Sequence, residues 1–123
     1  MKFKELTPMM ESNDLPGTVK FYTEILGFAV RDTFEDDGKT VWCTLHKDAV
    51  DIMFNLPNTI MNYGRILLSG SLYIYIDDVD GFWDKIKDKV EVLYPPEDFI
   101  YKMREFGIKD NNGYVLNFGT SIE

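Results

Sequence analysis

The sequence predicts an α+β fold in which two tandem β-α-β-β-β modules form a single domain over residues 1–123. The first observation is a helix signature that occurs twice, with the candidate capping residues Asp14 and Asp78 standing 64 residues apart. The second is that the apolar residues of both signatures recur at i, i+4, i+7 and i+11, as one face of a helix requires. The third is that one strand-like stretch precedes each helix and three follow it. A repeat this long indicates a duplicated module.

The first module is expected over residues 1–56. Its helix runs from Asp14 to Gly27, because Asp14 can cap the start and Gly27 can end it. The apolar face of this helix consists of Leu15, Val19, Tyr22 and Leu26. Strands are predicted at Glu5–Glu11, Phe28–Glu35, Lys39–His46 and Val50–Leu56, with a hairpin turn at Asp36-Asp37-Gly38.

The second module is expected over residues 70–123, and residues 57–69 join it to the first. Its helix runs from Asp78 to Val90, with Val79, Trp83, Ile86 and Val90 on the apolar face. Strands are predicted at Gly70–Ile76, Glu91–Leu93, Lys102–Lys109 and Tyr114–Gly119. We expect the prolines of Pro95–Asp98 to hold that segment out of regular structure.

Composition and charge narrow the classes of partner. The chain is 45% hydrophobic and 28% charged, as in ordinary globular proteins, and no apolar run is long enough to span a bilayer. With 13 basic and 21 acidic residues the net charge is −8, which disfavours nucleic acid and favours cationic molecules. The single cysteine, Cys43, excludes an intramolecular disulfide and a cysteine-rich zinc site. A reducing cytoplasm is therefore the expected location, without membrane association.

Three blocks of the sequence have a family pattern: Asp14-Leu15 followed by Phe21–Phe28, Tyr75–Val79, and Arg104–Phe106 followed by Asp110–Tyr114. Together they resemble the glyoxalase / bleomycin-resistance / extradiol dioxygenase superfamily, also called the vicinal oxygen chelate superfamily. The resemblance implies curved sheets with a helix on the convex side of each. It also implies a ligand cavity on the concave side, often near a dimer interface. The chain is closest in character to the metal-free bleomycin-resistance branch.

Metal-dependent members of this superfamily place His or Glu ligands on the concave faces of the sheets. The resemblance carries these positions onto Thr7, Asp51, Ser71 and Asn117. Thr, Ser and Asn supply neither the charge nor the basicity that holds a divalent ion, so we expect no metal and no cofactor. An alternative set of metal ligands consists of Glu11, His46, Asp51 and Glu105, and with it the chain would be a metal-dependent enzyme.

Alternation along the strands predicts which side chains face a ligand. The aliphatic residues of each strand belong against the helix, which leaves the other set free. The candidate ligand-binding residues are Met9, Glu11, Trp42, His46, Asp51, Met53, Tyr73, Tyr75, Met103 and Glu105. Their aromatic rings offer stacking and cation–π contacts, the methionines adapt to irregular shapes, and the carboxylates can pair with a cation.

The sequence therefore favours a metal-free protein that binds an aromatic and cationic small molecule, as antibiotic-resistance members of the superfamily do. No catalytic residue is assigned, and a binding protein is favoured over an enzyme. Two alternatives stay open: a metal-dependent lyase, isomerase or dioxygenase with an atypical site, and a ligand-free interaction domain. A homodimer is expected, because Met61, Tyr63, Phe99 and Tyr101 exceed what two short helices can bury.

Overall fold

The computed structural model describes residues 1–57 and 68–123. The chain divides into two compact units, Met1–Ile66 and Leu67–Glu123, and each unit contains one β-sheet. Within the described ranges, no helix combines the length and the apolar character needed to cross a membrane. The segment predicted to join the modules, residues 57–69, lies mostly outside these ranges, and so do Met61 and Tyr63.

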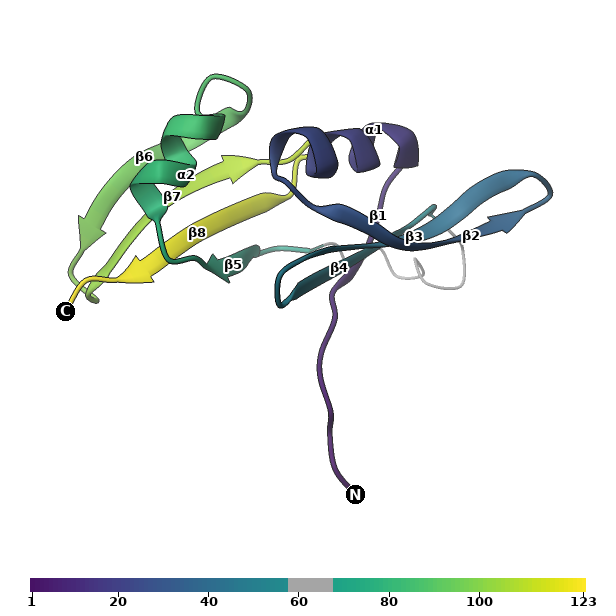
Figure 1. Ribbon diagram of the computed structural model, residues 1–123, viewed down its shortest axis with the longest axis horizontal. Helices are drawn as coiled ribbons and strands as arrows, with labels where there is room; N and C mark the ends of the chain where they lie inside the picture. Colours follow the sequence, from purple (N-terminus) through teal and green to yellow (C-terminus); the bar gives the residue numbers. More distant parts are fainter. Residues whose placement is uncertain (58–67) are drawn as a thin grey trace. The chain divides into compact units, whose positions relative to one another are not determined.

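The first unit is a four-stranded sheet with one helical segment on it (Figure 1). Its elements in chain order are β1 (Met9–Glu11), α1 (Leu15–Lys20), the π-helical turn η1 (Phe21–Ile25), β2 (Ala29–Asp36), β3 (Lys39–Lys47) and β4 (Val50–Asn55). The strand order is β1-β4-β3-β2. The β1–β4 pair is parallel, whereas β4–β3 and β3–β2 are antiparallel.

The second unit repeats this topology. Its elements are β5 (Ser71–Tyr75), α2 (Val79–Ile86), β6 (Glu91–Phe99), β7 (Met103–Lys109) and β8 (Val115–Ser121). The strand order is β5-β8-β7-β6, again with one parallel pair, β5–β8, and two antiparallel pairs. The predicted α+β class and the predicted order of elements in both modules are confirmed.

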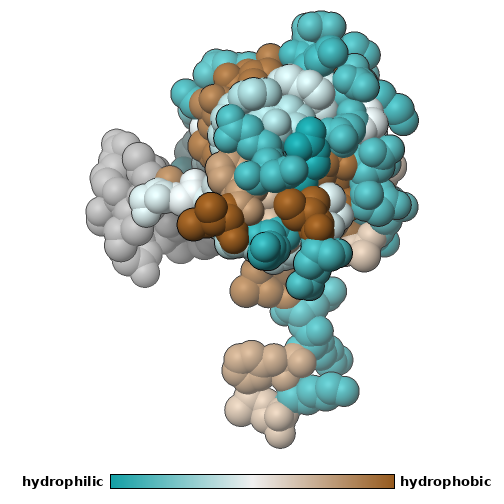
Figure 2. All heavy atoms as spheres, turned by 90° about the vertical axis from the view of Figure 1, so that its left-hand side faces the viewer, coloured by the Kyte–Doolittle hydropathy of each residue, from teal (hydrophilic) through white to brown (hydrophobic). Residues whose placement is uncertain are grey.

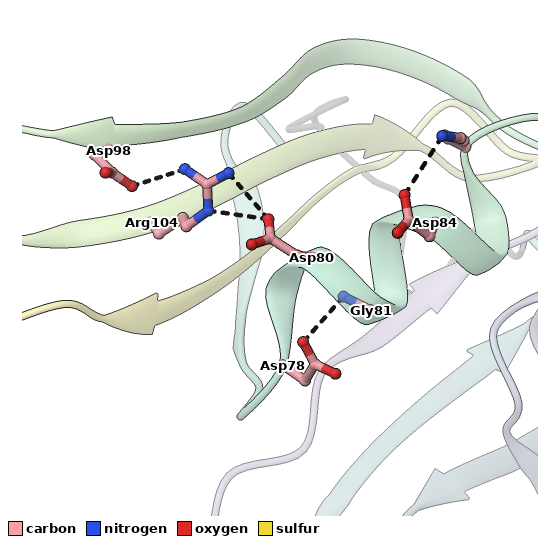
Figure 3. A network of polar contacts seen from close by, with 7 residues as sticks. Asp78, Asp80, Gly81, Asp84, Asp98 and Arg104 are labelled. Carbon is pink, nitrogen blue, oxygen red and sulfur yellow. Dashed lines mark hydrogen bonds and ion pairs between the residues drawn. The ribbon is translucent and has the colours of Figure 1, made fainter.

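The two helices begin in the same way. The Asp14 side chain accepts a hydrogen bond from the backbone N–H of Gly17, with 3.0 Å between Oδ1 and N. Asp78 accepts the equivalent bond from Gly81 at 2.9 Å (Figure 3). A Cβ on Gly17 or Gly81 would lie 2.3 or 2.2 Å from the capping carboxylate, so a larger residue at either position would displace the aspartate side chain from its present place. The repeat that predicted the modules thus extends to the cap geometry.

One face of each sheet forms the core beneath its helix. The largest fully buried side chains of the first unit are Leu15, Tyr22, Leu26, Leu45, Ile52 and Phe54. Those of the second unit are Ile86, Phe106, Ile108, Leu116 and Phe118. The strand residues among them alternate with side chains of the opposite face, as the sequence predicted. Each sheet therefore has one face packed against its helix and one face that the helix does not cover.

Both helices are shorter than predicted. The first segment ends at Ile25, and Gly27, which has a φ of +83°, then reverses the chain in the predicted way. The second helix ends at Ile86 and does not reach Val90. The Lys89 N–H donates to the Ile86 carbonyl at 2.8 Å. This bond spans three residues, whereas an α-helical bond spans four, so it tightens the turn that ends the helix.

The first strand is also shorter than predicted. It was expected over Glu5–Glu11 and is observed only over Met9–Glu11. Pro8 has no N–H to donate to a strand ladder, although its carbonyl accepts a bond from Met53 N at 2.9 Å. The proline therefore marks the point at which pairing with β4 begins.

The expectation for Pro95–Asp98 was wrong. These residues belong to β6, which runs over Glu91–Phe99 instead of stopping at Leu93. β6 is the edge strand of its sheet, where a missing proline N–H costs no ladder bond on the outer side. Its pairing with β7 is irregular between Val92 and Tyr94 and again between Tyr94 and Glu97. Such bulges are where an edge strand can accommodate proline.

Arg104 forms ion pairs between α2 and the sheet, on the face of the sheet that α2 covers (Figure 3). One guanidinium nitrogen lies 3.0 Å from a carboxylate oxygen of Asp80, in the first turn of α2. Another lies 2.8 Å from a carboxylate oxygen of Asp98 on β6. The arginine thus bridges the helix and the edge strand.

Candidate functional site

The second unit carries a buried carboxylate on the sheet face that α2 does not cover. Glu105 lies in the middle of β7 and is only 4% exposed. Its neighbour Phe106 is fully buried against Phe82 and Trp83 of α2, so alternation directs Glu105 to the opposite face. A carboxylate at such a position must be satisfied by nearby donors.

Three tyrosine hydroxyls supply those donors. Tyr73 donates to Glu105 Oε1 at 3.0 Å, and Tyr101 donates to the same oxygen at 2.7 Å. Tyr94 donates to Oε2 at 2.5 Å. The tyrosines come from three places in the chain: β5, β6 and the turn between β6 and β7. The carboxylate therefore links the edge strands of the sheet to its centre.

The sheet is shaped to receive two of these tyrosine side chains. A Cβ on Gly107 would lie 2.4 Å from Cε1 of the Tyr94 ring. A Cβ on Gly119 would lie 2.1 Å from the Tyr73 hydroxyl oxygen. The side-chain amide of Asn117 also donates to the Tyr94 hydroxyl oxygen at 2.7 Å. The hydroxyl of Tyr94 is thus fixed from two sides.

Ionisation follows from this arrangement. Burial by itself raises the pKa of Glu105, but the three tyrosine O–H donors outweigh burial and hold the pKa below its ordinary value. Burial and the bond to Glu105 raise the pKa of Tyr94 to about 12. The same two causes raise the pKa of Tyr73. Glu105 is therefore a carboxylate at neutral pH, and the tyrosines that hold it are protonated.

No cation neutralises this carboxylate within residues 1–57 and 68–123. Tyrosine hydroxyls solvate the charge without cancelling it. Glu97, which is exposed, pairs in register with Glu105 on the neighbouring strand and adds a second negative charge to this side. The site accordingly has a net negative charge beneath an aromatic surface.

The three tyrosines that bond Glu105 and the two rings in contact with them form a cluster that we call the tyrosine platform: Tyr73, Tyr75, Tyr94, Phe99 and Tyr101. Phe99 and Tyr101 are stacked, with ring centroids 5.4 Å apart and planes 8° from parallel. Tyr94 meets Phe99 edge-on, and the Tyr73 and Tyr75 centroids are 5.1 Å apart. Exposure rises outward, from 37% for Tyr73 to 56% for Tyr101 and 76% for Tyr75. The rings therefore offer π surface to a ligand.

The turn that carries Tyr101 lies at one end of the unit. Seen from that end, separate hydrophobic patches stand in a largely hydrophilic surface (Figure 2). Ile100, in this turn, is 97% exposed. An exposed apolar side chain next to the platform gives a further contact for an apolar ligand or for a second protein chain.

In the first unit, six predicted site residues share the face that the helix does not cover. Register places Met9 beside Met53, which also pairs with Thr44, and places His46 beside Asp51. Glu11 and Trp42 both pair with Asn55. The structure thus brings Met9, Glu11, Trp42, His46, Asp51 and Met53 to one face of the first sheet, and Tyr73, Tyr75, Met103 and Glu105 to one face of the second.

Asp51 already has a cationic partner. Arg31, in the bulged part of β2, places a guanidinium nitrogen 3.2 Å from Asp51 Oδ1. The pair is partly exposed, and such pairs contribute little to stability. Of the two carboxylates, Glu105 is therefore the better candidate for binding a cationic ligand.

The residues at the superfamily's metal positions do not fit a divalent ion. Asn117 is engaged with Tyr94, Asp51 with Arg31, and Thr7 and Ser71 offer neutral hydroxyls. In the alternative set, both oxygens of Glu105 are occupied by tyrosine hydroxyls. No three His, Cys, Asp or Glu side chains in the described part of the chain are grouped closely enough to hold a metal.

The arrangement of the sheets and this sequence agree with a known family. Residues 9–118 match the Glyoxalase/Bleomycin resistance protein/Dioxygenase superfamily. The chain belongs to this superfamily. The resemblance inferred from the sequence blocks is thereby confirmed. No curated protein matches the chain in sequence.

Several solved structures of the superfamily fold superimpose well. The bleomycin-binding protein from bleomycin-producing Streptomyces verticillus, complexed with copper(II)-bleomycin, is 21% identical, with a TM-score of 0.71 over 100% of this chain and 99% of that one. TnmS3, an antibiotic binding protein from Streptomyces sp. CB03234, is 19% identical, with a TM-score of 0.76 over 98% of each chain. A glyoxalase-related enzyme from Clostridium phytofermentans is 17% identical, with a TM-score of 0.76 over 99% and 98%. At these identities the likeness concerns the fold.

Sequence reasoning missed the part that Tyr94 plays and assigned Phe99 and Tyr101 only to an interface. Strict alternation from Val92 would place Tyr94 on the helix side. The bulge between Val92 and Tyr94 instead pairs Tyr94 with Gly107, on the face of Glu105. The available signal was the pair of glycines, since Gly107 and Gly119 occur in the two central strands where a large ring lies against the backbone.

Proposed function

We propose that this superfamily member is a metal-free protein that binds and sequesters an aromatic, cationic small molecule. The observation that carries the proposal is the buried carboxylate of Glu105, which is ionised, has no cationic partner among the described residues and lies beneath exposed aromatic rings. An anion under π surface attracts a flat cation through both cation–π contact and charge. The net charge of −8 raises the local concentration of cations further.

The superfamily context supports a small-molecule ligand. Two proteins with this fold are described as a bleomycin-binding protein and an antibiotic binding protein. We extend that property to this chain as part of the proposal. We also propose that the predicted residues on the uncovered face of the first sheet, including Trp42 and Met53, contact a ligand. A cytoplasmic location and the absence of a nucleic-acid partner belong to the same proposal.

The proposal includes a homodimer. All eight residues of the edge strand β2 are exposed, among them Val30 at 43% and Phe34 at 61%. An uncovered edge strand with apolar side chains favours pairing with another chain. Sedimentation is expected to give about twice the 14.3 kDa chain mass, and Phe34→Glu is expected to shift the protein toward the monomer. A monomer in the unmutated protein would contradict this part alone.

A matched pair of flat probes tests the proposal. Proflavine is a planar cation at neutral pH, and anthracene carboxylate is a three-ring anion of similar shape. We expect proflavine to bind about tenfold tighter by isothermal titration calorimetry. Glu105→Gln removes the charge with little change of shape and is expected to abolish most of this preference.

The control is Asp88→Asn, which changes the net charge by the same amount at an exposed residue beyond α2. It should leave the preference for proflavine intact. Equal binding of both probes to the unmutated protein would refute the electrostatic basis of the proposal. One divalent ion held per chain, in elemental analysis after exposure to nickel, zinc, manganese and iron, would refute the metal-free part and favour the enzyme alternative.

A further inference from the structure

We infer that the tyrosine platform selects quaternary ammonium cations over primary ammonium groups. This inference rests on the proposed function and names the chemical class of its ligand. It follows from the tyrosine O–H groups, which already donate to Glu105.

The oxygens of Glu105 are largely occupied. Oε1 accepts from Tyr73 and Tyr101, and Oε2 accepts from Tyr94. A carboxylate offers about four acceptor positions, so three of them are used inside the protein. With the side chain 4% exposed, a ligand can reach the carboxylate directly only by displacing a tyrosine hydroxyl.

The hydroxyl groups of Tyr73, Tyr94 and Tyr101 point inward as well. Their protons are committed to Glu105, and the Tyr94 oxygen also accepts from Asn117. The parts of Tyr73 and Tyr101 that remain exposed are therefore mainly ring surface. A hydroxyl that donates to an anion gains phenolate character, which makes the face of its ring a better partner for a cation.

The two kinds of cation lose different amounts on leaving water. A primary ammonium has three strongly hydrated N–H donors, and each needs an acceptor to replace water. The platform offers ring faces to the cation, and the nearby acceptor Glu97 is exposed and hydrated, so its pairing with an ammonium group contributes little. Part of the lost hydration is therefore not replaced. A trimethylammonium group has no N–H donor and places its charge on methyl groups that fit against aromatic rings. The site therefore binds the charge through the rings and not through hydrogen bonds.

Three soluble benzyl compounds test the inference by calorimetry: benzyltrimethylammonium, benzylammonium and uncharged benzyl alcohol. We expect benzyltrimethylammonium to bind at least about fivefold tighter than benzylammonium. Its N-methyl proton resonances should also shift upfield in NMR titrations, because they lie over ring faces.

A single hydroxyl provides the sharper test. Tyr101→Phe keeps the ring stacked on Phe99 but removes the O–H donor to Oε1, which opens an acceptor position at the exposed side of the site. The variant should bind benzylammonium more tightly than the unmutated protein does, so that the preference for the quaternary cation falls by about half or more. Tyr114→Phe, which removes a hydroxyl outside the platform, is the control and should leave the preference unchanged.

The outcomes separate the two proposals. If both ammonium compounds bind equally and better than benzyl alcohol, this inference is wrong while the cation-binding function stands. The inference would also be wrong if Tyr101→Phe kept the full preference for the quaternary cation. In that case the occupation of Glu105 by tyrosine hydroxyls would not be the cause of the preference. If benzyl alcohol binds as well as the cations, or if none of the three binds, both proposals fail.

Discussion

Arg104 and Glu105 are neighbours on β7, and their side chains lie on opposite faces of the sheet. Arg104 bridges Asp80 of α2 and Asp98 of β6 on the covered face. Glu105 accepts three tyrosine hydroxyls on the uncovered face. The Arg-Glu-Phe block that indicated the superfamily thus combines a structural residue, a site residue and, in Phe106, a core residue.

Arg104→Gln separates these roles. The substitution removes two partly exposed ion pairs and is expected to lower the free energy of unfolding by about 1 kcal/mol. Proflavine affinity should stay unchanged, because Arg104 is outside the tyrosine platform. Urea denaturation and calorimetry measure the two effects. A large loss of affinity with little loss of stability would show that Arg104 acts on the ligand.

Acid should weaken the fold through Glu105. Because its folded-state pKa lies below its ordinary value, its contribution is present above the unfolded-state pKa of about 4.3 and is lost as the pH falls through the lower folded value. The free energy of unfolding should therefore fall from neutral pH to about pH 3 more steeply in the unmutated protein than in Glu105→Gln. Parallel pH profiles in urea denaturation would contradict the assignment. Glu97 is exposed beside this site and is present in both proteins, so it does not distinguish them.

Alkali should reveal the tyrosines that hold Glu105. The pKa of Tyr94 is raised to about 12, and those of Tyr73 and Tyr101 are also raised. Their stabilising contribution is present below the unfolded-state pKa of about 10 and is lost as the pH rises through the folded-state values. Tyrosinate absorbance should show these three tyrosines titrating late in the folded protein and normally in urea. In Glu105→Gln these three should ionise at lower pH, because the carboxylate no longer opposes their charge.

Much of the fold was predictable because local sequence patterns determine its helices, strands and turns. Capping aspartates, apolar helix faces and turn sequences recur at the same interval, and they produce the same topology twice. Alternation correctly separated Phe106 from Glu105 and Leu116 from Asn117. These features depend on residues close together in the chain, where spacing alone fixes which face a side chain takes.

The site was predictable only in part because its geometry depends on irregular pairing. The bulge that moves Tyr94 to the face of Glu105 cannot be read from alternation. Hydrogen bonds from Tyr73, 32 residues from Glu105 in the chain, depend on strand order and register. Asp51 was expected to be available for a cation, and the cation that it meets is Arg31 of the same unit.

Gly119 should be as important for the site as any charged residue. A Cβ at this position would lie 2.1 Å from the Tyr73 hydroxyl oxygen, well inside the contact distance of the two atoms. Gly119→Ala must therefore push the hydroxyl away from Glu105, which loses one of its three donors and gains a higher pKa.

The Gly119→Ala protein should fold, since a long side chain can move its tip aside at a cost of about 1–3 kcal/mol. One tyrosine fewer should titrate late in alkali. The affinity for benzyltrimethylammonium should also fall, because the displaced Tyr73 ring no longer keeps its present contact with the Tyr75 ring. Gly70→Ala is the matched control, because a Cβ there meets no atom within 4 Å, and it should behave as the unmutated protein does. If Gly119→Ala keeps as many late-titrating tyrosines as the unmutated protein and keeps full affinity, the contact between Tyr73 and Glu105 does not organise the site.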